Sequence, residues 1–85
     1  MVRNDDLVAI FHSIHRVMKA EKLLKQARVD ILLIPVPRQL SSDCGLAIRY
    51  PALSRREVEA VLERERLLPE ELYLFRDGVF HRQSP

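Results

Sequence analysis

The fold is decided by the stretch Leu7–Ala27, LVAIFHSIHRVMKAEKLLKQA. Its first residues, Leu7–Phe11, are all apolar and include branched and aromatic side chains, which favours a buried β-strand. Ser13 is a suitable N-cap for a helix that follows directly. Apolar residues then recur at the three- and four-residue spacing of an amphipathic helix, at Ile14, Val17, Ala20, Leu24 and Ala27. A strand followed at once by a helix predicts a fold that mixes α and β structure.

Two more strands are expected on either side of a long loop. The second strand is predicted at Val29–Ile34, because Pro35 and Pro37 then remove two backbone donors and lead the chain out of the sheet. The third strand is predicted at Leu46–Tyr50, which alternates in polarity and is stopped by Pro51. The connection over residues 35–45 is the longest loop of the chain, near the length at which loops tend to be functional.

A second helix is predicted from a capping box at Ser54–Glu57. In this motif the serine hydroxyl and the glutamate carboxylate satisfy each other's backbone donors, so the helix begins at Arg55. Leu53 and Val58 are spaced as a hydrophobic staple, and Pro69 is expected to end the helix.

The C-terminal part reads as a strand at Leu72–Phe75 followed by Asp77–Gly78, a dipeptide typical of tight hairpins, so that Val79–Arg82 adds an extra C-terminal strand. The order β-α-β-β-α-β predicts an α+β, ferredoxin-like sandwich with two helices on one face of an antiparallel sheet. We expect a single domain over residues 1–85 with its core at about residues 7–76.

Composition narrows the class of protein. A chain of 85 residues is near the lower limit for one self-sufficient core, so a large internal substrate cavity is not expected. The net charge is only +2 and acids alternate with bases, so we expect no nucleic acid partner. The longest apolar stretch, Ile31–Val36, is far short of the roughly 20 residues that cross a bilayer. With no secretory signal, these features predict a cytoplasmic protein, and the edge strands leave a homodimer open.

Cys44 is the single cysteine and lies in the small-residue turn Ser41–Gly45. With one cysteine no internal disulfide can form, which favours a reducing compartment. Polar neighbours and glycine indicate a thiol that is displayed rather than packed. The sequence therefore points to one reactive sulfur.

Several neighbours are suited to support a thiolate, which is the nucleophilic form of cysteine. Ser41 and Ser42 can donate hydroxyl hydrogen bonds, and Gly45 lets a backbone amide approach the sulfur. Arg38 or Arg49 supplies positive charge if the loop folds over.

Other interpretations of these residues stay open. Cys44 is also consistent with a partly buried thiol without chemistry, or with a redox sensor that forms mixed disulfides. His12, His15 and His81 add metal-ligand types, but their spacing lacks the close pairs of a structural zinc site, so no metal is predicted. His15 belongs to the first turn of the predicted helix and is the histidine expected to assist the sulfur, although a solvated surface role fits it equally well.

A binding or regulatory module is the rival from another class, because ferredoxin-like sheets often expose a face or an edge to ligands. The aromatic residues that RNA binding would use are few and lie in core-like runs, at Phe11, Tyr50, Tyr73 and Phe75. If Cys44→Ala abolishes activity and leaves the fold intact, chemistry at the sulfur is favoured; if activity follows the sheet surface, the binding module is favoured.

Four segments together resemble the selenium/sulfur carrier protein-like family: FHSIH at Phe11–His15, AEKLLK at Ala20–Lys25, IPVPR at Ile34–Arg38 and LSSDCGLA at Leu40–Ala47. The similarity extends over about Leu7–Phe75, and its most specific part leads from the proline-arginine pair to the cysteine-glycine pair. A member of this family is implied to be a small bacterial cytoplasmic protein whose cysteine holds sulfur or selenium as a persulfide or selenosulfide.

The resemblance implies Cys44 as the carrier nucleophile, presented by Arg38, Ser41, Ser42 and Gly45, with His15 matching a recurring histidine. Asp43 departs from the small or polar residue that the family tends to have there. The implied protein is not an enzyme but a partner of enzymes, receiving sulfur or selenium from a donor such as a cysteine desulfurase and passing it to a biosynthetic acceptor. Such exchange chemistry needs neither a metal nor an organic cofactor.

Overall fold

The computed structural model describes residues 2–84, which form five strands, two α-helices and one 3-10 turn. In chain order the elements are β1 (Asp6–Ile10), α1 (Ile14–Gln26), β2 (Leu32–Pro35), β3 (Leu46–Pro51), the 3-10 turn η1 (Ala52–Ser54), α2 (Arg55–Arg64), β4 (Glu71–Arg76) and β5 (Val79–Gln83). The predicted order of strands and helices, including the extra C-terminal strand, is confirmed.

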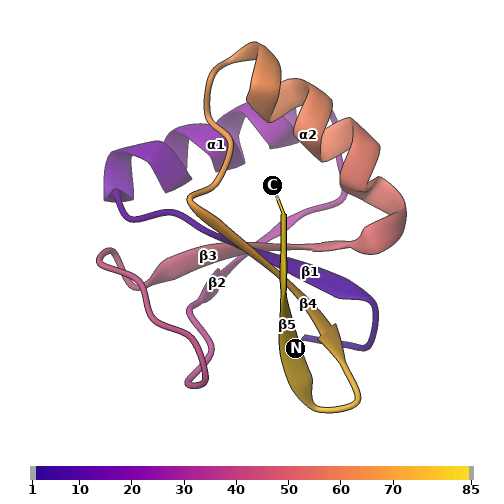
Figure 1. Cartoon of the computed structure of the whole chain (residues 1–85). Coiled ribbons are helices and arrows are strands. Elements are labelled where there is room, and N and C mark those ends of the chain that lie inside the picture. Colours follow the sequence, from indigo (N-terminus) through magenta and orange to yellow (C-terminus); the bar gives the residue numbers. More distant parts are fainter. Residues whose placement is uncertain (1, 85) are drawn as a thin grey trace.

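The strands make one open sheet in the order β2-β3-β1-β4-β5, and all neighbours are antiparallel. The central strand is β1, and its Asp6 lies opposite Pro51 of β3 on one side and Phe75 of β4 on the other. Both helices cover the same face of the sheet (Figure 1). This is the ferredoxin-like α+β arrangement that the sequence predicts, with β5 added at the edge beside β4.

Burial on both faces explains why the sequence of β1 is apolar throughout. Leu7, Ala9 and Phe11 belong to the core under the helices. Val8 and Ile10 belong to a second, smaller cluster on the other face, which the loop after β2 helps to cover. A strand that is buried on both sides cannot alternate in polarity, so a continuous apolar run is the expected signal.

The helix α1 begins as predicted. Ser13 is its N-cap and accepts a hydrogen bond from the Arg16 N–H at 3.3 Å. Its buried residues are Val17, Ala20 and Leu24. Two residues that the periodicity assigned to the apolar face, Ile14 and Ala27, are instead exposed, because they lie at the two ends of the helix beyond the part that the sheet covers.

The helix α2 begins at Arg55 as predicted, but the predicted capping box does not form. Ser54 has φ −92° and ψ 3°, and its side chain makes no capping hydrogen bond. The 3-10 turn η1 after Pro51 gives Ser54 this turn conformation, whereas an N-cap needs the extended backbone that Ser13 has. Leu53 is 98% exposed, so the hydrophobic staple with Val58 is also wrong.

Both helices end in the same way, which corrects two further predictions. Arg28 and Arg66 adopt left-handed conformations with φ of 60° and 56°. In each case the next residue donates a hydrogen bond back into the last turn, from the Val29 N–H to Leu24 O at 3.1 Å and from the Leu67 N–H to Leu62 O at 2.7 Å. These are Schellman motifs. Accordingly α2 ends at Arg64 and not at Pro69, and residues 29–31 close α1 and do not belong to β2.

The hairpin between β4 and β5 is confirmed. Asp77 and Gly78 both have positive φ, 52° and 79°, as a type I′ turn requires. Phe75 then lies opposite Phe80, and their ring centroids are 4.8 Å apart.

Candidate functional site

Cys44 lies at the end of the loop that joins β2 to β3, one residue before the glycine that precedes β3. Its side chain is half-buried and packs against the core under the helices. The Sγ atom is 3.1 Å from Phe11 O and 3.4 Å from Leu46 O. The expectation of a displayed thiol is therefore corrected: the residue is half-buried, and its sulfur contacts two backbone carbonyl oxygens.

The loop reaches the sulfur by passing around the end of the sheet (Figure 1). Val36 and Leu40 pack on the face away from the helices, whereas Cys44 packs on the helix side. The Val36 N–H donates to Gly45 O at 3.0 Å and so closes the loop at its base. Gly45 has φ +74°, a left-handed conformation that glycine adopts without steric cost. The position of Cys44 is thus fixed by contacts on both faces of the sheet.

Ser42 is the side chain most closely associated with the sulfur. Its Oγ atom is 3.4 Å from Cys44 Sγ, accepts from the Cys44 N–H at 3.2 Å and donates to Phe11 O at 2.9 Å. A hydroxyl hydrogen can rotate between acceptors. Ser42 can therefore turn its hydrogen from the carbonyl oxygen toward a sulfur that has lost its proton.

The surroundings of the sulfur contain two opposing influences. The carbonyl oxygens of Phe11 and Leu46 are acceptors, so these contacts suit a thiol that keeps its proton. Phe11, however, comes three residues before the first residue of α1, whose N-terminal end favours nearby negative charge, and the first turn of α1 contains no acidic residue. The Ser42 hydroxyl is the one side-chain donor within reach of the sulfur among the described residues.

The structure does not bring all of the predicted neighbours to the sulfur. Arg38, Ser41 and Asp43 are exposed, and their side chains make no hydrogen bond or ion pair within residues 2–84. Arg49, considered as a source of charge for the thiol, pairs instead with Asp6 at 3.0 Å. Of the predicted loop residues, only Ser42 and Gly45 are linked to Cys44 by the contacts described above.

The histidines are arranged differently from the expectation. His15 is exposed on α1 and makes no side-chain hydrogen bond in the described part of the chain. His12 lies beside Phe11, and its Nε2 atom is 2.8 Å from Glu71 Oε2. The Tyr73 hydroxyl donates to the other carboxylate oxygen of Glu71 at 2.6 Å. This pair was not predicted because His12 and Glu71 are far apart in sequence and no local pattern connects them.

Hydrogen bonding shifts the protonation of this cluster. The bond from Tyr73, followed by that from His12, lowers the pKa of Glu71, and the same contact with Glu71 raises the pKa of Tyr73. Glu71 is therefore a carboxylate at neutral pH, so the Nε2 atom of His12 is the donor in their hydrogen bond. No three side chains of His, Cys, Asp or Glu among residues 2–84 come together in a group that could hold a metal ion.

The sequence model of the family described as "Putative Se/S carrier protein-like" matches residues 6–74, which include every element from β1 through most of β4. The chain belongs to this family. No curated protein and no solved structure matches it. The resemblance in the cysteine loop is thus confirmed at the level of the family.

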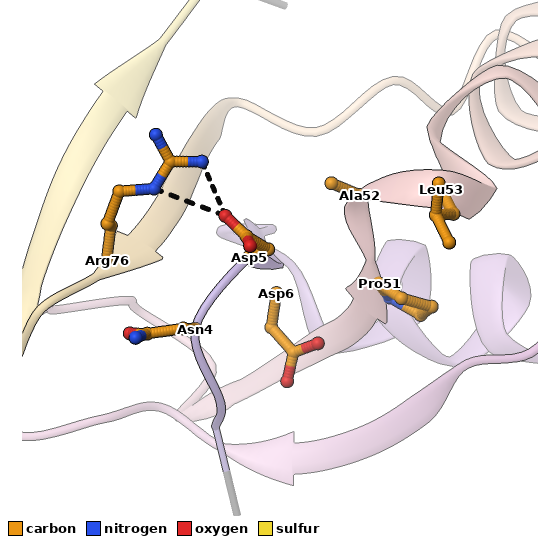
Figure 2. A pocket seen from close by; sticks show the side chains of 7 residues that line it. All are labelled: Asn4, Asp5, Asp6, Pro51, Ala52, Leu53 and Arg76. Carbon is orange, nitrogen blue, oxygen red and sulfur yellow. Dashed lines mark hydrogen bonds and ion pairs between the residues drawn. The ribbon is translucent and has the colours of Figure 1, made fainter.

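A surface hollow of about 530 Å³ in this carrier-like protein does not coincide with the sulfur. Figure 2 shows that it is lined by the start of β1 and the end of β3, with Arg76 on one side and Leu53 on the other. Cys44 precedes β3, so the length of that six-residue strand, about 20 Å, separates the two. Asp5 and Arg76 pair across the hollow, which leaves their charges already neutralised.

Two further findings concern RNA binding and membrane insertion. Phe11 and Tyr50 are buried under the helices, and are therefore unavailable for stacking on an RNA base. No helix within residues 2–84 has the length and apolar character needed to span a membrane.

Proposed function

We propose that this protein carries sulfur or selenium on Cys44, as a persulfide or a selenosulfide, between a donor enzyme such as a cysteine desulfurase and a biosynthetic acceptor. The observation that carries the proposal is the half-buried sulfur with Ser42 Oγ at 3.4 Å and Phe11 O at 3.1 Å, in a chain that belongs to the carrier-like family. The protein would be a substrate of its partner enzymes and would not catalyse turnover.

The chemistry is a balanced exchange. The Cys44 thiolate attacks the outer sulfur of a donor persulfide, a new bond forms between the two sulfurs, and the donor's own sulfur–sulfur bond breaks. The donor leaves as a thiolate, and Cys44 then holds the outer sulfur with its proton. No electrons are gained or lost overall, so no oxidant is needed. An acceptor nucleophile later attacks the same outer sulfur and releases Cys44 as a thiolate.

The residues around the sulfur divide into two groups in this proposal. Ser42 and Gly45 position Cys44, the first by a hydroxyl that can donate to the thiolate and the second by its left-handed backbone. Arg38, Ser41 and His15 are exposed and would meet the partner and not the sulfur itself. Asp43 is exposed as well, so solvent screens its charge from the thiolate.

A half-buried sulfur is consistent with the needs of a carrier. A persulfide is readily reduced by small thiols, and the carbonyl-lined side of the site restricts their approach. The open side still admits a partner. The single cysteine removes any internal thiol that would resolve the persulfide, and a reducing bacterial cytoplasm is the compartment in which such a carrier would operate.

The decisive experiment is the intact mass of the protein after incubation with a cysteine desulfurase and cysteine, and separately with a selenosulfide donor, beside a Cys44→Ser control. We expect one added sulfur or selenium on the wild type, removable by a reducing agent, and none on the control. An unmodified wild type together with slow alkylation of Cys44 would overturn the proposal.

One observation favours a second candidate. The thiol hydrogen bonds to Phe11 O and Leu46 O, together with packing against the core, suit a structural cysteine in a non-catalytic binding or regulatory domain. In that case Cys44→Ser would lower the free energy of unfolding, and alkylating agents would reach Cys44 only upon unfolding.

A further inference from the structure

Two of the exposed large apolar side chains lie next to each other on α1. Ile14 is 45% exposed and Met18 is 42% exposed. They are four residues apart, so they are neighbours on the helix surface. Apolar residues that remain this exposed in the first two turns of a helix contribute little to the core, so their apolar surface is available to another molecule.

The side of α1 on which Ile14 and Met18 lie follows from the contacts of Arg16, which is two residues from each of them. Arg16 donates to Leu68 O at 2.9 Å and pairs with Glu70 at 3.2 Å, so its side of α1 faces the segment between α2 and β4. Two residues correspond to about 200° of rotation around a helix. Ile14 and Met18 are therefore on the opposite side of α1, which faces the β3 and β2 edge of the sheet.

This is the side on which the cysteine loop ends. The loop contacts Phe11 O through Ser42 and Cys44, immediately before α1 begins, and α1 packs on β3. In Figure 1 the segment that leads into β3 lies below the start of α1, in agreement with these contacts. The apolar pair thus belongs to the same end of the molecule as the sulfur.

Both signs of charge lie near this pair: Glu21 is three residues from Met18 and Lys22 is four residues from it, and Lys19 is three residues from Lys22 on the outer side of the helix. Lys19 and Lys22 are exposed, and neither forms an ion pair with any side chain that the structure describes. Lys25 differs, because it pairs with Glu21 at 3.2 Å. Glu21 is the single acidic residue of α1, whereas α2 alternates acids and bases and pairs Arg55 with Glu59. Positive charge is thus concentrated on α1.

We infer that the outer side of α1, with Ile14, Met18, Lys19 and Lys22, forms a docking surface at the same end of the molecule as Cys44, for a partner protein whose contact surface has acidic side chains around an apolar centre. This inference rests on the proposed function, because it assigns the surface against which sulfur is exchanged. The exposed apolar pair supplies the desolvated centre of the contact, and the two lysines supply the charged rim. Opposite charge at the rim of an interface mainly accelerates and orients encounter.

The test uses two synthetic peptides that each contain one cysteine between leucines, flanked by glutamates in one and by lysines in the other. Each cysteine is activated as a mixed disulfide with 5-thio-2-nitrobenzoate. Attack by the Cys44 thiolate forms a disulfide with the peptide and releases thionitrobenzoate, whose absorbance gives the rate. We expect the acidic peptide to react on the order of tenfold faster at low salt, with the ratio falling toward one at high salt.

Charge-reversal variants distinguish an effect of this surface from an effect of the protein's net charge. K19E/K22E should reverse the preference between the peptides, whereas R56E/R66E, which makes the same change in net charge on and after α2, should preserve it. M18S should slow both peptides several-fold without changing their ratio. Equal rates for the two peptides in the wild type, or the same behaviour from both double variants, would overturn the docking surface.

A neutral small disulfide, 2,2′-dithiodipyridine, distinguishes the two proposals. If it modifies Cys44 and neither peptide shows the charge preference, the docking surface is wrong and carriage by Cys44 is unaffected. If it fails to modify Cys44 in the folded protein, the sulfur is unreactive and the proposed function itself is overturned.

Discussion

The two ends of the β1–β3 strand pair differ in how their polar groups are satisfied. At the end where the cysteine loop arrives, backbone carbonyls, one hydroxyl and one thiol share uncharged hydrogen bonds around Phe11. At the other end, the Asp6 carboxylate accepts from Arg49 at 3.0 Å and from the Arg3 N–H at 2.9 Å. Asp6 is the one charged residue that is buried among the described residues. The buried ion pair stabilises the sheet at the charged end. The hydrogen bonds around the sulfur are uncharged and weaker, so the groups that contact the sulfur can rearrange more easily.

The largest effect on the free energy of unfolding is expected from disrupting the Asp6–Arg49 ion pair at the charged end. Asp6→Asn removes the charge that compensates Arg49, and both side chains are largely buried, at 7% and 16% exposed. We expect a loss of about 3 kcal/mol in the free energy of unfolding, measured by urea denaturation, because an uncompensated buried charge is costly. The control is Asp5→Asn, whose ion pair with Arg76 is exposed and screened by solvent, so this substitution should change stability far less than Asp6→Asn. Equal losses would show that burial does not distinguish the two pairs.

A smaller effect on stability, but a specific one on reactivity, is expected at the sulfur end. Ser42→Ala removes a donor to Phe11 O and an acceptor for the Cys44 N–H, and we expect a loss of about 1 kcal/mol. Alkylation of Cys44 by iodoacetamide at neutral pH should slow several-fold, because the hydroxyl no longer stabilises the thiolate. Ser41→Ala is the matched control and should change neither quantity. Faster alkylation in Ser42→Ala would mean that the serine shields the sulfur instead.

A third prediction concerns the Glu71 cluster on β4, next to the sulfur end. Hydrogen bonds from Tyr73 and His12 lower the pKa of Glu71 below its ordinary value of 4.5. The carboxylate therefore contributes stability that is present above pH 4.5 and lost as pH falls through the lowered pKa. Glu71→Gln should lower the free energy of unfolding by up to about 1 kcal/mol at pH 7, and the difference from wild type should shrink in acid. A difference that is constant with pH would contradict this assignment.

The smallest effect is expected at the rim of the hollow beside the charged end. Leu53 is 98% exposed, so Leu53→Ser should change the free energy of unfolding by less than about 0.5 kcal/mol. A hydrophobic staple with Val58 would make the same substitution clearly destabilising. Thermal unfolding beside Val58→Ala, which removes a buried side chain, provides the comparison on the same helix.

Much of the fold could be predicted from local patterns. The apolar run of β1, the Ser13 cap of α1 and the Asp77–Gly78 turn each depend on neighbouring residues, and all three are confirmed. The errors occur where backbone geometry overrides a motif. Ser54 has the sequence of a cap but is the last residue of a 3-10 turn. Arg66 closes the end of a helix in a left-handed conformation that sequence normally signals with glycine.

The candidate site was less predictable than the fold. The sequence singled out Cys44 and Ser42 because they lie in one turn, but the carbonyl oxygen that holds both belongs to Phe11, more than thirty residues away. His12 pairs with Glu71 on another strand, and no spacing rule connects them. Helix phase alone could have shown that His15 lies on the outer surface, because it is two residues from the buried Val17.

The central place of β1 has a consequence for biosynthesis. The strand β1 is synthesised before both of its neighbours, β3 and β4, and Asp6 lacks its second neighbour until Phe75 has been synthesised. Until then α1 has no complete sheet on which to bury Val17, Ala20 and Leu24. Folding of the sheet should therefore follow the synthesis of β4, and a nascent chain stalled before β4 should expose apolar surface to chaperones.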